Sequence, residues 1–196
     1  MERTWWERTL LVLRRPGEVF AALREELPQA SVNTLGWHDH RFPLREGDSH
    51  VQFDLNDRDY PELEHHDVVV CCEVIEHLHV APVPVLRFLA SGLRDGGHLI
   101  LQTPNATALP KRLRMLLGRN PYDPIREHPG NPGHFHEHTV RELLSDVEAA
   151  GLEVTQWQTQ NYFNHGSRKN TAYRATAKVL PRTLREGITV VARPRR

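Results

Sequence analysis

The stretch that decides the fold is His66-Asp67-Val68-Val69-Val70-Cys71-Cys72, followed directly by Glu73-Val74-Ile75-Glu76-His77-Leu78. Its first half is apolar at consecutive positions, which is typical of a strand covered on both faces of a mostly parallel sheet. Its second half places charged side chains directly after the strand. Because ligands of open α/β sheets bind at the carboxyl ends of the strands, this segment predicts a central strand with functional residues at its end.

Strands and helices alternate on both sides of this segment. The patterns predict strands over 31–35, 50–55, 67–72, 98–102, 152–160 and 188–192, and helices over 83–93, 106–118, 139–151 and 171–180. Thr139, with Glu142 three positions later, predicts a capping box at the start of the helix over 139–151. This alternation predicts an α/β fold with a doubly wound, Rossmann-like, mostly parallel sheet. A length of 196 residues suits one domain over 1–196, which we divide into an N-terminal helical cap (1–30) and an α/β core (31–196).

Composition excludes several classes of protein. Lys and Arg number 25, as do Asp and Glu, and a formal charge of zero argues against a protein built chiefly to bind nucleic acid or an anionic membrane. No apolar run approaches the roughly 18 residues of a transmembrane span, and the N-terminus lacks the pattern of a signal peptide. Cys71 and Cys72 are neighbours and cannot link distant segments, so we expect a reducing, cytoplasmic location.

Three segments in order carry a family resemblance. Residues 66–78 are the first, Leu93-Arg94-Asp95-Gly96-Gly97-His98-Leu99-Ile100-Leu101-Gln102-Thr103-Pro104-Asn105 is the second, and His134-Phe135-His136-Glu137-His138-Thr139 opens the third. Together they resemble class I S-adenosylmethionine-dependent methyltransferases over about residues 50–160. The resemblance implies S-adenosylmethionine as cofactor, with cofactor contacts at the end of the fourth strand: Cys72, Glu73 and Val74.

The cofactor-binding half departs from that family. Its members carry a glycine-rich turn after the first strand, because the cofactor needs close approach to the backbone. If residues 31–35 form the first strand, only Gly36 matches this turn. The 36 positions from Ser31 to Asp67 are also too few for three strands with two crossovers, which need about 60. We therefore expect a sheet that is one βα unit short in its N-terminal half.

Asp54 is the second candidate in this half, at the end of the expected strand over 50–55. If that strand is the family's second, Asp54 would bind the ribose of the cofactor, and if it is the third, Asp54 would lie near the adenine. The alternative is a structural role, in which Asp54 caps a turn.

The charged residues after the central strand suggest a metal site. On a helical turn, Glu73, Glu76 and His77 share one face, and two carboxylates with an imidazole suit a divalent cation such as Mg or Mn, or Fe, Co or Zn. The E-x-x-E-H arrangement with a distant His resembles small-RNA 3′-terminal 2′-O-methyltransferases and ubiquinone-type O-methyltransferases. That resemblance makes Glu73, Glu76, His77 and His134 the metal ligands, with His136 as the neighbouring candidate for the last of them. Two alternatives stay open: His77 or His136 acts as a general base, or the motif is structural.

The function indicated is O-methylation of a hydroxylated small molecule or sugar, assisted by a divalent metal. The rival is a catalytically silent scaffold whose glycine turn no longer holds the cofactor. An RNA end as acceptor follows from the resemblance but is unsupported by the charge balance. The segment around Trp5-Trp6 is interpreted as a cap over the cofactor site or a homodimer face. The basic amphipathic helix over 106–118 could dock an anionic acceptor or form a solvated face.

Overall fold

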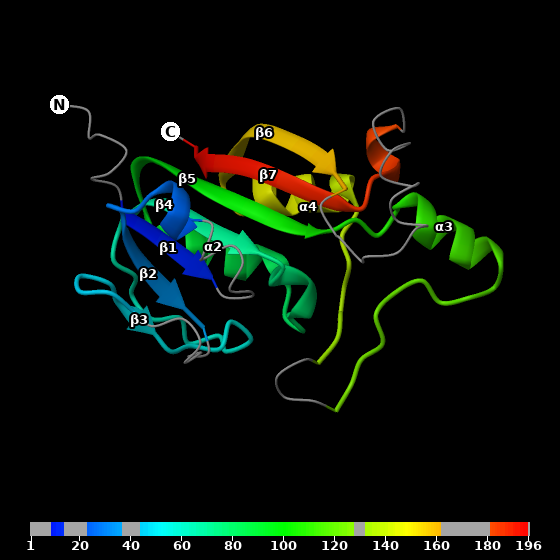
Figure 1. Cartoon of the computed structure of the whole chain (residues 1–196), viewed down its shortest axis with the longest axis horizontal. Helices are drawn as coiled ribbons and strands as arrows, with labels where there is room; N and C mark the ends of the chain where they lie inside the picture. The colour runs from blue at the N-terminus through cyan, green and yellow to red at the C-terminus, as the bar shows by residue number, and fades with distance from the viewer. Residues whose placement is uncertain (1–8, 14–22, 37–43, 128–131, 162–180, 196) are drawn as a thin grey trace.

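A computed structural model describes residues 9–13, 23–36, 44–127, 132–161 and 181–195. It contains a seven-stranded sheet in the order β3-β2-β1-β4-β5-β7-β6 (Figure 1). All neighbouring strands are parallel except that β7 runs antiparallel to β5 and β6. The strands are β1 (Thr9–Leu13), β2 (Ser31–Leu35), β3 (His50–Val51), β4 (His66–Cys72), β5 (Leu93–Pro104), β6 (Leu152–Gln160) and β7 (Gly187–Pro194). The prediction of an α/β fold with a mostly parallel sheet is confirmed.

In the described part of the chain, the helices α2 (Pro82–Ser91), α3 (Leu109–Leu116) and α4 (Val140–Ala149) lie between strands. Two short 3-10 turns, η2 (Ile75–His77) and η3 (Arg182–Leu184), are also present. The capping box expected at the start of α4 is present, since the Glu142 amide donates to Thr139 Oγ1 and the Thr139 amide donates to the Glu142 carboxylate. Among the described residues, no helix has the length and apolar content that a bilayer crossing requires.

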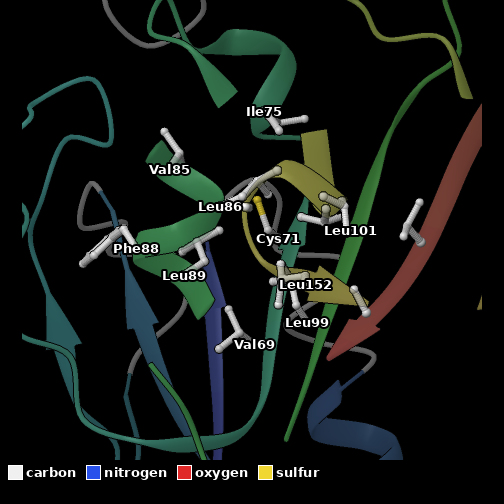
Figure 2. Packing of buried hydrophobic residues seen from close by; sticks show 14 of the residues in the cluster. Val69, Cys71, Ile75, Val85, Leu86, Phe88, Leu89, Leu99, Leu101 and Leu152 are labelled. Atoms are coloured by element: carbon white, nitrogen blue, oxygen red, sulfur yellow. The ribbon is translucent and has the colours of Figure 1, made fainter. Parts of the chain in front are cut away.

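The sheet is covered on both faces. On one face, Val69 and Cys71 of β4 and neighbouring leucines of β5 pack against Leu86 and Leu89 of α2 (Figure 2). On the other face, Val70 and Cys72 of β4 pack with residues of β1, β2 and the segment around residues 23–27. Successive side chains of β4 therefore enter opposite cores, as its continuous apolar run predicts.

The N-terminal half is not short of a strand. The expected helical cap over 1–30 is wrong at Thr9–Leu13, which forms β1 between β2 and β4. Ser31–Leu35 is therefore the second strand, and the expectation of a missing βα unit is wrong. The apolar run Thr9–Leu13 is compatible with either a buried strand or a helix. It forms a strand because it pairs with β2 on one side and with β4 on the other. Trp5-Trp6 and the helix expected over 171–180 lie outside the described residues.

Candidate active site

The turn after β4 does not continue as an α-helix. Glu73 has a φ of 55°, a left-handed conformation that non-glycine residues rarely adopt, and its amide donates to Gln102 O at 2.8 Å. Only the short turn η2 follows. The helical face that would have joined Glu73 to Glu76 and His77 therefore does not form, although Ile75 and Leu78 are buried in the core.

A different trio comes together at this place. Glu76, His77 and His134 each offer a ligand atom, and these three atoms lie within 4.8 Å of one another. The segment carrying His134 is held against η2 because the amides of Phe135 and His136 both donate to the Glu76 carbonyl, at 2.8 and 3.3 Å. The rings of His77 and His134 are 4.8 Å apart between centroids. Two segments distant in sequence thus build one cluster.

The Glu76 carboxylate is the buried centre of this cluster. It has no exposed surface, and burial raises its pKa. Its Oε2 accepts a hydrogen bond of 2.9 Å from Thr103 Oγ1. Its Oε1 lies 3.7 Å from His77 Nε2 and has no hydrogen-bond partner among the described residues. A buried oxygen without a donor is destabilising by about 1–3 kcal/mol, and a cation would satisfy it.

Both imidazoles are oriented through Nδ1. His77 Nδ1 lies 2.6 Å from Gly133 O, and His134 Nδ1 lies 2.9 Å from Glu137 Oε1. A carbonyl and a carboxylate only accept, so each Nδ1 donates, and in the neutral ring each Nε2 carries the lone pair. Metal-binding histidines have this arrangement. The donor set and the orphaned carboxylate oxygen fit a divalent cation.

Glu137 is a member of the site that the sequence did not reveal. Its side chain is nearly buried between His134 and Lys111 of α3, and its second oxygen forms an ion pair with Lys111 Nζ. Burial alone would raise the pKa of Glu137, but the hydrogen bonds from His134 and Lys111 outweigh burial and lower it. Glu137 therefore stays ionised and holds His134. Its position three residues after His134 was a signal available in the sequence.

Gly133 contributes through its backbone. Its φ is 85°, and a Cβ there would overlap the carbonyl of Pro124. The position therefore requires glycine, which keeps the Gly133 carbonyl within reach of His77.

His136, the alternative base, lies outside the cluster. Its ring packs edge-on against His138 at 4.7 Å between centroids. Both line an open cavity of about 910 Å³ between η2 and the start of α4, together with residues such as Leu78 and Asp146.

The remaining candidates of the N-terminal half lie after β2 and β3. Gly36 follows β2, where its amide donates to Val51 O, so its expected place in the turn after the first strand is wrong. The residues that follow β1, 14–22, lie outside the described residues. Asp54 follows β3, the third strand in chain order, and its Oδ1 accepts from the Asn56 amide and side chain at 2.9 and 3.0 Å, which is the turn contact of the structural alternative.

The end of β4 is apolar and uncharged up to Glu73. Cys72 is buried, and burial, together with the nearby carboxylates Glu73 and Glu76, raises the pKa of its thiol to about 12. Val74 is partly buried against the core. The Cys72 thiol is therefore neutral at physiological pH and not a nucleophile.

Comparisons with known proteins agree with this architecture. A family model described as a methyltransferase domain matches residues 16–157. A comparison with curated proteins finds no match.

Three solved structures illustrate the similarity of fold. An S-adenosylmethionine-dependent methyltransferase from Mesorhizobium loti is 16% identical, with a TM-score of 0.63 over 95% of this chain and 91% of that one. A putative methyltransferase of Haloferax volcanii, in complex with the Trm112 methyltransferase activator, is 14% identical, with a TM-score of 0.64 over 96% and 83%. An O-methyltransferase from neocarzinostatin biosynthesis, in complex with S-adenosyl-L-homocysteine and 1,4-dihydroxy-2-naphthoic acid, is 13% identical, with a TM-score of 0.54 over 98% and 51%.

The matched region runs from the segment after β1 into β6 and includes the whole of the β4 turn. The chain belongs to the class I S-adenosylmethionine-dependent methyltransferase family.

Proposed function

We propose that the protein transfers a methyl group from S-adenosylmethionine to a hydroxyl of a small molecule or sugar, with a divalent cation held by Glu76, His77 and His134. The observation that supports a bound cation is the environment of Glu76 Oε1. This oxygen is buried, lacks a hydrogen-bond donor among the described residues and lies beside His77 Nε2. The neighbour from neocarzinostatin biosynthesis, which was solved with a dihydroxylated ligand, supports a hydroxyl acceptor.

In this reaction the bond between the methyl group and the cofactor sulfur breaks as the methyl group bonds to the acceptor oxygen. The electron pair of the broken bond stays on the sulfur of S-adenosylhomocysteine, and the hydroxyl proton is released to solvent water. A bound divalent cation lowers the pKa of a hydroxyl and fixes its orientation. This chain supplies the binding groups: Glu76, His77 and His134 hold the cation, and Glu137 and the Gly133 carbonyl keep both imidazoles turned toward it.

We assign the cofactor to the neighbouring part of the same sheet edge. Cys72 ends β4, Glu73 and Val74 follow it directly, and Asp54 follows β3, where we assign it to the adenine side. Because Asp54 Oδ1 already accepts two hydrogen bonds from Asn56, its Oδ2 is the oxygen we assign to the cofactor. Glu73 stays close to the cation site in sequence, and we assign it to the cofactor rather than to the cation because it is outside the cluster of three.

A metal-free reaction is the second candidate. His77 Nδ1 donates to Gly133 O, so Nε2 of the neutral ring can accept the hydroxyl proton as a general base. His136 would be the base only for an acceptor that reaches the cavity it lines.

Calorimetric titration with S-adenosylhomocysteine, in the presence and absence of Mg²⁺, Mn²⁺ or Zn²⁺, tests the proposal. We expect wild-type protein to bind both the cofactor product and one cation, and Glu76→Gln and His134→Ala to lose the cation while still binding S-adenosylhomocysteine. His65→Ala is the matched control, because this exposed histidine precedes β4 at the opposite end of the strand.

The outcomes separate the candidates. Absence of S-adenosylhomocysteine binding would contradict methyl transfer and favour the silent scaffold. Cofactor binding with no cation, together with turnover lost in His77→Ala, would favour the general base.

A further inference from the structure

Helix α3 is unlike the other helices because it buries none of its residues. It stands beyond the carboxyl end of β5, apart from α2 and α4 (Figure 1). Large apolar side chains are exposed along it and in the residue that ends it: Leu113 by 52%, Met115 by 55%, Leu116 by 82% and Leu117 by 71%. Exposed apolar surface of this concentration marks an interaction site.

Three of these four apolar residues form a stripe with cations on both sides. At 3.6 residues per turn, Leu113, Leu116 and Leu117 share one face of the helix, and Arg112 and Arg114 project from its two flanks. Arg119 follows just after the helix. This is the pattern of a helix that lies in a membrane interface, with its apolar face in the lipid and its cations at the headgroups.

The charge at this place is unbalanced although the chain as a whole is neutral. Residues 106–122 contain Lys111, Arg112, Arg114 and Arg119 and no carboxylate. Glu137 neutralises Lys111, and the nearby Asp123 is paired with Arg126. In the part of the chain that the structure describes, no carboxylate forms an ion pair with Arg112, Arg114 or Arg119.

We propose that residues 109–119 form a docking surface for an anionic lipid bilayer. The positive charge disfavours pairing of α3 with α3 of a second copy, because the same cations would face each other. The exposed leucines disfavour RNA as the partner, because binding to the RNA backbone requires the cations but not an apolar stripe. An anionic bilayer satisfies both features, since each cation near its surface strengthens binding and the apolar side chains enter the acyl boundary.

Flotation with phosphatidylcholine vesicles, with and without phosphatidylglycerol, tests this surface on the full-length protein. We expect binding to the phosphatidylglycerol vesicles, weakened by high salt, and little binding to pure phosphatidylcholine. Arg112→Gln/Arg114→Gln should weaken partitioning roughly 30-fold, because each surface cation contributes about a fivefold factor. Leu116→Ser/Leu117→Ser should abolish flotation. Its circular dichroism spectrum should be unchanged because neither side chain is buried.

Ile125→Ser is the matched control, since Ile125 is 64% exposed but lies outside the surface. It should float as the wild type does. Four results would overturn the proposal: no flotation of the wild type, equal binding to neutral vesicles, equal loss in the control, or a concentration-dependent dimer that Leu116→Ser/Leu117→Ser dissociates. Binding to single-stranded RNA that the leucine variant leaves intact would assign the surface to RNA instead.

Discussion

At the scale of single residues, the orientation of His134 depends on one carboxylate. Glu137 accepts from His134 Nδ1 and is held by Lys111. Glu137→Gln removes the charge and can turn its amide NH₂ toward His134, so we expect cation affinity to fall by about 10- to 100-fold, the usual effect of losing such a partner. Titration of Mn²⁺ measures this. Glu148→Gln, an exposed change on α4, is the control, and equal cation affinity in both variants would show that Glu137 does not position His134.

His138 predicts a pH dependence of stability. It is 2% exposed, and neither ring nitrogen has a hydrogen-bond partner among the described residues. Burial, with a smaller effect of the neighbouring His136 charge, lowers the pKa of His138 from 6.5 to about 4. The unfolded chain therefore binds more protons than the native protein between these values. Above pH 6.5, His138 should not reduce the free energy of unfolding. As the pH falls from 6.5 toward about 4, its protonation in the unfolded chain should reduce the free energy of unfolding by about 3 kcal/mol at most.

Urea unfolding at several pH values measures this contribution, with His138→Phe as the comparison. The variant removes the titrating group and two unsatisfied polar atoms, so its free energy of unfolding should equal or exceed that of the wild type at pH 5. Because burial also lowers the pKa of His66, some pH dependence should persist in the variant. Identical pH profiles for the two proteins would exclude a contribution from His138.

At the scale of elements, the start of α4 predicts a measurable cap. Thr139 Oγ1 accepts from the Glu142 amide at 3.2 Å, which satisfies one of the free amides of the first turn. Thr139→Ala should lower the free energy of unfolding by about 1 kcal/mol, as measured by urea denaturation. Ser145→Ala, an exposed change within the same helix, should be nearly neutral. If both variants unfold at the same urea concentration, the cap contributes nothing.

Elements with a clear pattern were predictable from sequence, and those that depend on partners were not. The alternation over 152–160 and the capping box at Thr139 predict β6 and α4 almost to the residue. The five residues of β1 carry no alternation, and only pairing with β2 and β4 identifies them as a strand. The E-x-x-E-H spacing suggested a helical face, but the left-handed conformation of Glu73 breaks it. Such a conformation in a non-glycine residue has no sequence signature.

At the scale of the whole molecule, the site is a product of topology. The order β3-β2-β1-β4-β5 brings the carboxyl ends of parallel strands to one edge, so Asp54, the β4 turn and the segment of His134 converge there. The sequence named each of these candidates. It could not show that His134 joins Glu76 and His77 while His136 lines the cavity between η2 and α4, because that depends on how residues 132–139 pack against η2.

Cofactor binding at this edge should stabilise the whole fold, because a ligand that binds only the native state adds to its free energy of unfolding. At a concentration of S-adenosylhomocysteine 100 times its Kd, the gain is about 2.7 kcal/mol, which for a chain of this size raises Tm by roughly 5–10 °C. Asp54→Asn keeps the oxygen that accepts from Asn56 but removes the carboxylate charge, so we expect an unchanged Tm without ligand and a smaller ligand-induced rise. Asp57→Asn is an exposed change in the same loop, and its Tm should rise on ligand binding by as much as that of the wild type. Scanning fluorimetry measures all three proteins: an equal rise in each would remove Asp54 from the cofactor site, and no rise in any would contradict cofactor binding itself.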